Sequence, residues 1–256
     1  MAVRTEPNRE NIMRTVVFLF PGTWGNDTAE RVLWWFERPI EALLDVNPKI
    51  DVVPIVYAGT TFGEIVCDVL VQLRRYCTGD MRPVALAYGM GRQIFSEVFD
   101  ILACPHFERV AHIAGVPRNG VPVLGTLDAF RAAPRLFLRS LGGTAMPASV
   151  DEVNRIMCSG TDEELAEEII RKISPEAMYW KIAGLFLPGL RVTTPPIEIP
   201  VFATLGLQDA IVGRADYAGD NMIAFNRLEG NHAIIRKDRP DIRATWERQA
   251  KFLLEA

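Results

Sequence analysis

The sequence lacks the features that would assign it to several special classes of protein. It has no uninterrupted apolar run of about 18 residues, the length needed to cross a bilayer, and its polar N-terminus has no apolar core of a secretory signal. It also lacks an excess of basic residues: 28 are basic and 32 acidic, a formal charge of −4, whereas nucleic-acid binders are normally basic. We therefore expect a cytoplasmic protein that binds neither a membrane nor nucleic acid.

Residues for metal, redox and nucleophilic chemistry are also few. The four cysteines, Cys67, Cys77, Cys104 and Cys158, have a spacing that fits no zinc or redox motif. No nucleotide-binding loop or flavin fingerprint is present, so we expect no metal and no cofactor. Only three histidines and five serines occur in the chain, which leaves few candidates for a general base or a hydroxyl nucleophile.

What the sequence does contain is ample material for a folded core. Hydrophobic residues make up 49% and charged residues 23% of the 256 positions, close to globular averages, so disorder is excluded. Short apolar runs, rich in β-branched and aromatic residues and bounded by turn residues, predict six strands, at 15–20, 51–56, 83–87, 109–114, 200–205 and 221–227. Helical patterns separate the first four, an alternation typical of an α/β fold with a mostly parallel sheet flanked by helices.

The middle of the chain has a different character. Between about residues 117 and 196 no buried strand is predicted, and helical patterns occur at 127–141, 149–157, 162–173 and 175–187. We interpret residues 117–195 as a helical cap inserted into a core formed by 1–116 and 196–256. The alternative is an extension of the core that covers nothing. The many Phe, Leu and Met residues of this segment favour a small, apolar ligand.

In an open parallel sheet, ligands bind beyond the carboxyl ends of the strands. The segments that follow four of the predicted strands are the ones of interest: Gly22-Thr23-Trp24-Gly25, Tyr88-Gly89-Met90-Gly91, Gly206-Leu207-Gln208-Asp209 and Glu229-Gly230-Asn231-His232. Along the chain they supply glycine-rich turns with free backbone N–H groups, then an acid, then a histidine. That order suggests that the four segments form a single site.

These segments resemble the α/β-hydrolase superfamily. VVFLFPGTWG resembles its first strand and oxyanion loop, with Pro21 in place of the usual histidine, and VALAYGMGRQI resembles its nucleophile elbow. VFATLGLQDAIV resembles the segment that carries the triad acid, here Asp209, and LEGNHAIIRKDRPDI resembles the histidine loop, here His232. The likeness covers about residues 15–116 and 196–256, and the middle fits the family's variable cap.

The sequence departs from the family at the residue that attacks the substrate. The central position of the elbow, where the family carries Ser, Cys or Asp, is Gly89, between the small residues Ala87 and Gly91. Ser96 lies seven residues further on, roughly 10 Å along a helix with a rise of 1.5 Å per residue. No serine or cysteine follows any predicted strand, so covalent acyl-enzyme catalysis is not expected.

The resemblance implies roles for the groups that remain. Asp209 would orient His232 and stabilise its charged form, and His232 would act as a general base. The backbone N–H groups of Thr23 and Met90 would form an oxyanion hole. Such a set suits a lyase, a cyclase or a non-covalent hydrolase acting on a carbonyl compound, with water or a substrate group beside Gly89.

Other readings of the same residues stay open. The chain is alternatively an inactive hydrolase-like binding protein, or a serine esterase or thioesterase whose nucleophile has been replaced by Gly89. Trp24 and Tyr88 line the site or belong to the core. The remaining histidines are expected to be structural, the pair Arg236 and Lys237 to be solvated, and the oligomeric state is open, a homodimer being one alternative.

Overall fold

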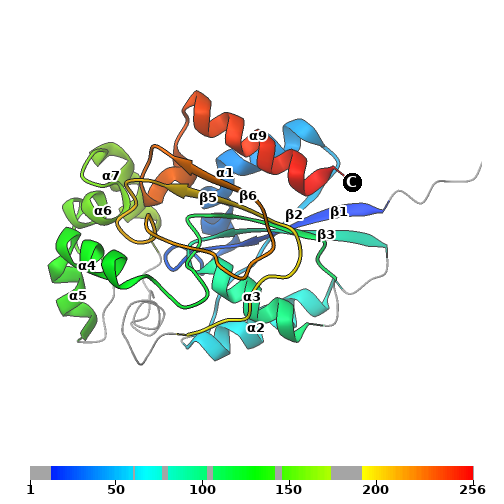
Figure 1. Ribbon diagram of the computed structural model, residues 1–256, viewed down its shortest axis with the longest axis horizontal. Coiled ribbons are helices and arrows are strands. Elements are labelled where there is room, and N and C mark those ends of the chain that lie inside the picture. The colour runs from blue at the N-terminus through cyan, green and yellow to red at the C-terminus, as the bar shows by residue number, and fades with distance from the viewer. Residues whose placement is uncertain are drawn as a thin grey trace, which may run out of the picture.

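The computed structural model describes residues 13–59, 61–76, 80–102, 106–141, 146–173 and 192–255 (Figure 1). Its centre is a six-stranded sheet in the order β2-β1-β3-β4-β5-β6, in which every neighbouring pair is parallel. The strands are β1 (Arg14–Phe20), β2 (Asp51–Pro54), β3 (Met81–Tyr88), β4 (Arg109–Ile113), β5 (Val201–Gly206) and β6 (Met222–Leu228). The predicted α/β class and all six predicted strands are confirmed.

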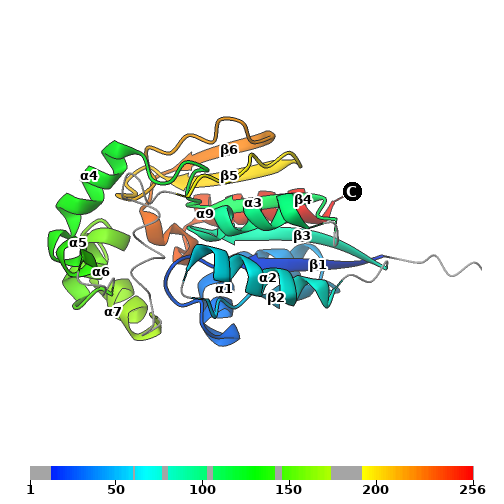
Figure 2. The same ribbon diagram turned by 90° about the horizontal axis from the view of Figure 1, so that it is seen from below.

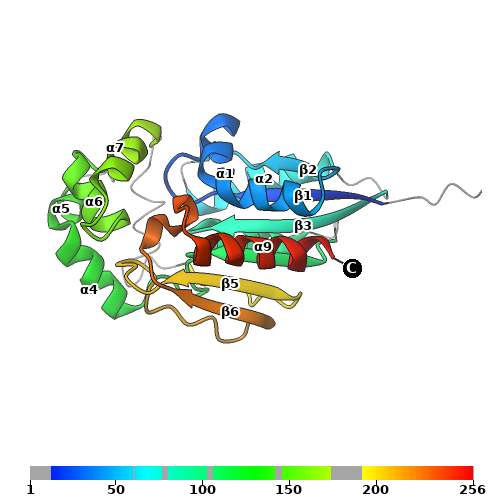
Figure 3. The same ribbon diagram turned by 90° about the horizontal axis from the view of Figure 1, so that it is seen from above.

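Helices cover both faces of the sheet. One face carries α1 (Ala29–Val46) and α9 (Pro240–Leu254), and the other carries α2 (Phe62–Arg74) and α3 (Gly91–Ile101) (Figures 1 and 3). The central strands read as continuous apolar runs because both faces are buried. At the edge, β6 alternates between half-buried and exposed residues instead.

Among the described residues, four helices lie between β4 and β5 and are called the insertion helices below. They are α4 (Val123–Ala132), α5 (Pro134–Leu141), α6 (Val150–Met157) and α7 (Glu163–Lys172). They gather beyond the carboxyl ends of the strands, at one end of the sheet (Figure 2). No described residue between 117 and 195 belongs to a strand.

Two details of the predicted middle segment change. The single helix predicted at 127–141 is wrong, because the structure has two helices that meet at Ala133 and Pro134. Ala133 has φ −140° and ψ 66°, since a residue before proline is kept out of the α region. The helix predicted at 175–187 lies outside the described residues. Within the described part of the chain, no helix is long and apolar enough to span a bilayer.

A buried ion pair connects the start of α3 to the segment that precedes β6. The side chains of Arg92 and Asp220 both have 0% exposure, and Nη2 of Arg92 lies 2.6 and 2.5 Å from the two carboxylate oxygens. Asp220 Oδ1 also accepts from the backbone N–H of Ile197 at 3.0 Å. The pair therefore connects α3 to the segment before β6, which contains Asp220, and through Asp220 to the segment before β5, which contains Ile197.

Removal of one partner should leave the other charge buried and unpaired. We expect Asp220→Asn to lower the free energy of unfolding by about 3–5 kcal/mol, measured by urea denaturation. The matched control is Asp151→Asn, because Asp151 pairs with Arg155 on the surface, where both side chains are more than half exposed. That pair should contribute less than about 1 kcal/mol. Equal effects of the two substitutions would contradict a structural role for the buried pair.

Candidate active site

Two glycines make the sharp turn from β3 into α3. Gly89 has φ +55°, a conformation that side-chain-bearing residues rarely adopt. A Cβ atom on Gly91 would lie 2.1 Å from the carbonyl oxygen of Phe20, so only glycine fits at that position. The turn therefore presents residue 89 at the carboxyl end of the central strand, as the elbow motif predicts.

The predicted acid and histidine meet at this same edge of the sheet. Asp209 follows β5, and His232 begins the short 3₁₀ helix η1 (His232–Arg236). Oδ2 of Asp209 lies 2.8 Å from Nδ1 of His232, and Oδ1 accepts from the backbone N–H groups of Ile211 and Val212 at 2.7 and 2.9 Å. The Asp209 side chain has 0% exposure and that of His232 8%. Because the carboxylate accepts a hydrogen bond from the Nδ1–H group, the neutral imidazole carries its proton on Nδ1 and its lone pair on Nε2.

Nε2 of His232 faces the elbow glycine. A Cβ atom placed on Gly89 would lie 3.7 Å from Nε2 and 3.4 Å from Cα of Gly22, which are ordinary contact distances. The space beside Gly89 would thus admit a small side chain near the imidazole, at the cost of the backbone strain that φ +55° imposes on any residue other than glycine. Since residue 89 is glycine, a space the size of a small side chain is left beside Nε2, and we call it the Gly89 gap.

The two predicted oxyanion-hole donors lie next to the gap. Thr23 and Met90 both line the pocket that contains Gly89 and His232. Neither backbone N–H donates a hydrogen bond to any residue that the structure describes. Both groups are therefore available to a ligand oxygen.

The pocket above the gap is apolar. It is partly open to solvent. Its described lining, in which His232 is the one readily ionised side chain, comprises Thr23, Trp24, Trp35, Tyr88, Gly89, Met90, Val116, Leu136, Phe137, Ile156, Met157, Ile211 and His232. Helices α5 and α6 supply four of these residues, so the insertion helices form one wall. Among the described residues, no group of three or more His, Cys, Asp or Glu side chains is arranged to hold a metal ion.

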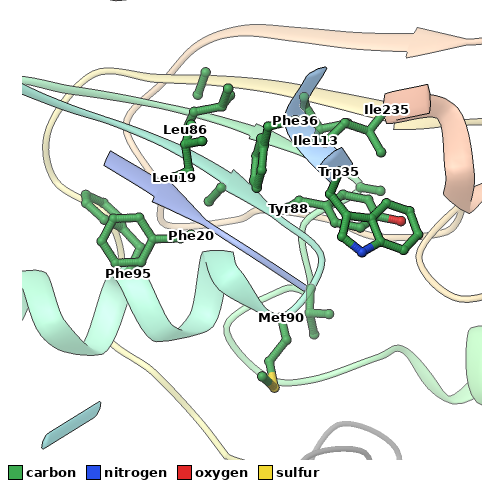
Figure 4. Packing of buried hydrophobic residues seen from close by; sticks show 14 of the residues in the cluster. Leu19, Phe20, Trp35, Phe36, Leu86, Tyr88, Met90, Phe95, Ile113 and Ile235 are labelled. Carbon is green, nitrogen blue, oxygen red and sulfur yellow. The ribbon is translucent and has the colours of Figure 1, made fainter. Parts of the chain in front are cut away.

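Two aromatic rings pack in sequence against the His232 ring. Tyr88 lies 5.3 Å from the His232 ring, and its hydroxyl donates to the His232 carbonyl oxygen at 3.1 Å. Trp35 stacks on Tyr88 at 5.3 Å with an interplanar angle of 29° (Figure 4). Burial, with a smaller contribution from the charge of Asp209, raises the pKa of Tyr88 well above its usual value. Tyr88 therefore stays protonated and serves as a support, not as a base.

Arg236 was expected to be solvated, and that expectation is wrong. Its side chain is only 7% exposed and donates to Glu37 at 2.7 Å, while its guanidinium lies 4.2 Å from the centre of the Trp34 ring. Because it ends η1, Arg236 fixes the segment that begins with His232. The sequence contains no local signal for this contact, since Trp34 and Arg236 are 202 positions apart.

The other histidines lie apart from this pocket. His112 is fully buried on β4, with its ring 4.4 Å from that of Tyr217. Burial, and then the charge of Arg92, lowers the pKa of His112 well below its usual value, so it is neutral at physiological pH. His106 is exposed in the loop before β4.

No protein-family model and no curated protein sequence matches the chain. Solved structures do match over nearly its full length. One is an extracellular α/β-hydrolase from a Paenibacillus species (TM-score 0.64, 16% identity, 94% of this chain and 100% of that one). Another is an esterase from Exiguobacterium antarcticum (0.64, 13%, 93% and 92%), and a third is a type II thioesterase of the borrelidin biosynthetic cluster (0.53, 16%, 96% and 94%). The chain has the α/β-hydrolase fold.

Within the part of the chain that the structure describes, no serine or cysteine lines the pocket that contains Gly89 and His232. The Ser96 hydroxyl lies inside α3 and donates to the carbonyl oxygen of Pro195. Cys158 follows α6 and is fully buried. Burial raises the pKa of the Cys158 thiol to about 12, although the charge of Lys237 partly opposes it. Cys158 is thus a protonated, inert thiol.

This difference should be visible in alkylation. At pH 8 we expect iodoacetamide to modify Cys67, which is exposed, and to leave Cys158 unmodified in the folded protein, because the thiolate is the reactive form. Peptide mass spectrometry would measure both sites, and denaturation in urea should make both react. Rapid labelling of Cys158 in the native protein would contradict this assignment and reopen the question of a cysteine nucleophile.

Proposed function

We propose that this chain is an enzyme of α/β-hydrolase fold that acts without a covalent intermediate. His232, oriented by Asp209, serves as general base toward a small, apolar carbonyl compound. The reaction belongs to the lyase, cyclase or non-covalent hydrolase type. The observation that carries the proposal is the paired dyad, whose free Nε2 faces a glycine where the nucleophile of a hydrolase would stand.

The base is supported by its fixed surroundings. The bond from Nδ1 to Asp209 holds one tautomer, and the carboxylate stabilises the imidazolium that forms when Nε2 takes a proton. General-base catalysis of this kind contributes about 10²- to 10⁴-fold in rate. Asp209 stays in place because two backbone N–H groups bind its other oxygen.

The Gly89 gap receives the group that gives up the proton. This group is a water molecule or an O–H or C–H of the substrate itself. When the group is water or a substrate O–H, its oxygen forms a bond to the carbonyl carbon as Nε2 takes the proton, and the π electrons of the C=O bond move onto the carbonyl oxygen. When the group is a C–H beside the carbonyl, the electrons of the broken C–H bond form an enolate. In both cases negative charge develops on the carbonyl oxygen. The N–H groups of Thr23 and Met90 stabilise that oxygen, and His232 then returns the proton to the leaving group or product.

The groups present in this site are better suited to catalyse proton transfer than ordinary acyl transfer. In a triad enzyme, loss of the nucleophilic serine costs about 10⁶-fold in turnover, and the remaining rate comes from the oxyanion hole and binding. Abstraction of a proton needs only a base and a stabilised oxyanion. The names of the structural neighbours, an esterase and a thioesterase among them, support carbonyl chemistry in general.

The pocket favours a neutral, apolar substrate. Its described wall offers aromatic and aliphatic side chains and no carboxylate, lysine or arginine. A charged substrate would lose its hydration without gaining a partner. We assign the insertion helices the role of a cap, because Leu136, Phe137, Ile156 and Met157 form the wall on their side.

The role of His232 is tested by its removal. We expect turnover of an apolar ester, thioester or hydroxy-ketone, detected by mass spectrometry of the products, to fall at least about 100-fold in His232→Ala. The variant should stay folded but melt at a lower temperature, because the buried Asp209 carboxylate loses one of its partners. The matched control is His106→Ala, since His106 is exposed and outside the pocket. Equal turnover in His232→Ala and the unaltered protein would refute the proposal.

A serine at position 89 tests the alternatives. The Cβ of Gly89→Ser would lie 3.7 Å from Nε2, so its hydroxyl falls within hydrogen-bond reach of the base. We expect this variant to gain labelling by a fluorophosphonate and a burst with p-nitrophenyl acetate, both dependent on His232. Gain of activity in a chain whose unaltered form makes no product would favour an esterase with a replaced nucleophile. Ligand-induced thermal stabilisation with no activity in either form would favour a binding protein.

A further inference from the structure

The buried side-chain amide of Asn26 binds the loop that follows β1. The Asn26 side chain has 0% exposure, and its Nδ2 donates to the carbonyl oxygens of both Gly22 and Thr23, each at 2.8 Å. Both acceptors are carbonyls, so the nitrogen of the amide must face them. Asn26 is absent from the lining of the pocket, whereas Thr23 is part of it.

This contact determines which way the loop's N–H groups point. In a planar trans peptide, the C=O and the N–H of one unit point in opposite directions. The Gly22 carbonyl faces Asn26, so the Thr23 N–H of the same peptide faces the other way. That peptide borders the Gly89 gap, because a Cβ on Gly89 would lie 3.4 Å from Cα of Gly22.

A second buried residue holds the same side of the loop. The Tyr57 hydroxyl donates to the Pro21 carbonyl oxygen at 3.1 Å, and the Tyr57 N–H donates to the Asn26 carbonyl oxygen at 2.8 Å. Three consecutive carbonyls, those of Pro21, Gly22 and Thr23, are therefore bound by side-chain donors. Their orientation is fixed before any ligand arrives.

Packing alone does not account for an asparagine at this position. Oδ1 of Asn26 is buried and has no hydrogen-bond partner in the described structure. An unpaired buried acceptor is unfavourable, and an aliphatic residue of similar size would avoid it. The side chain is therefore best explained by its two N–H groups, which match the two carbonyls.

We propose that Asn26 is a positioning residue of the oxyanion hole. It touches no substrate and acts through the Gly22–Thr23 peptide, whose N–H it keeps directed at the gap. The part of this inference that concerns catalysis rests on the proposed function. The part that concerns the orientation of the peptide stands on the hydrogen bonds alone.

The experiment compares Asn26→Asp and Asn26→Ser with the unaltered protein. Aspartate has the same shape but donates nothing and repels the carbonyls, whereas serine keeps one donor. We expect crystal structures to show the Gly22–Thr23 peptide rotated in Asn26→Asp. In that variant kcat should fall about 10- to 100-fold with KM changed less than about threefold, and Asn26→Ser should be intermediate.

A remote asparagine supplies the control. Nδ2 of Asn221 donates to the Glu198 carbonyl oxygen at 3.0 Å, outside the site, so Asn221→Ala should leave kcat and KM unchanged. A peptide that keeps its orientation in both Asn26 variants would overturn the proposal. A rotated peptide with unchanged kcat, or loss of folding in both variants, would overturn it as well.

Failure of the proposed function is distinguishable from failure of this inference. If the unaltered chain shows no His232-dependent turnover, the proposed function fails while the crystal structures still decide the peptide's orientation. The kinetic comparison is then made in a Gly89→Ser background, where the rate of acylation by p-nitrophenyl acetate depends on the same N–H groups. An unchanged acylation rate in Asn26→Asp would again overturn the positioning role.

Discussion

The hydrogen bond between Asp209 and His232 is the interaction on which the site depends. It forms because β5 and β6 end at the same edge of a parallel sheet, and Asp209 and His232 follow these two strands. Each partner is fixed separately: Asp209 by two backbone N–H groups, and His232 by the Tyr88 hydroxyl. Arg236 anchors the other end of η1 on Trp34. The imidazole is therefore held at a fixed distance from residue 89. At that distance a side chain on residue 89 would contact Nε2, so the glycine leaves Nε2 open to a ligand.

Much of this site is predictable from the sequence because its signals are local. The buried strands are short apolar runs, and Gly89, Asp209 and His232 each follow such a run within a few residues. In a parallel sheet, the ends of those runs must converge. The order of the motifs along the chain then supplied the resemblance to α/β-hydrolases, which the shared fold of the solved structures confirms.

The rest of the site depends on contacts that leave no local pattern. Trp35 reads as one apolar residue on the inner face of α1, yet it stacks on Tyr88 far along the chain. Arg236 stands in a polar sequence, yet it is buried by residues about 200 positions away. Asn26 follows a glycine-rich turn and looks like a turn residue. Only the folded chain shows that its amide faces two carbonyls.

The arrangement of charge suggests how such a site favours a transition state over a ground state. The described pocket wall is neutral, and the nearest fixed charge to the base is the buried carboxylate of Asp209. A neutral substrate can enter without losing an ion's hydration. In the proposed reaction, charge then appears in two places at once, on the imidazolium beside Asp209 and on the oxygen beside the loop N–H groups. Both partners are already oriented, and Asp209 and His232 are buried, so the interaction of Asp209 with the imidazolium is stronger than in bulk solvent. Because Asp209 and the loop are fixed before reaction, the stabilisation requires no reorganisation as the proton moves.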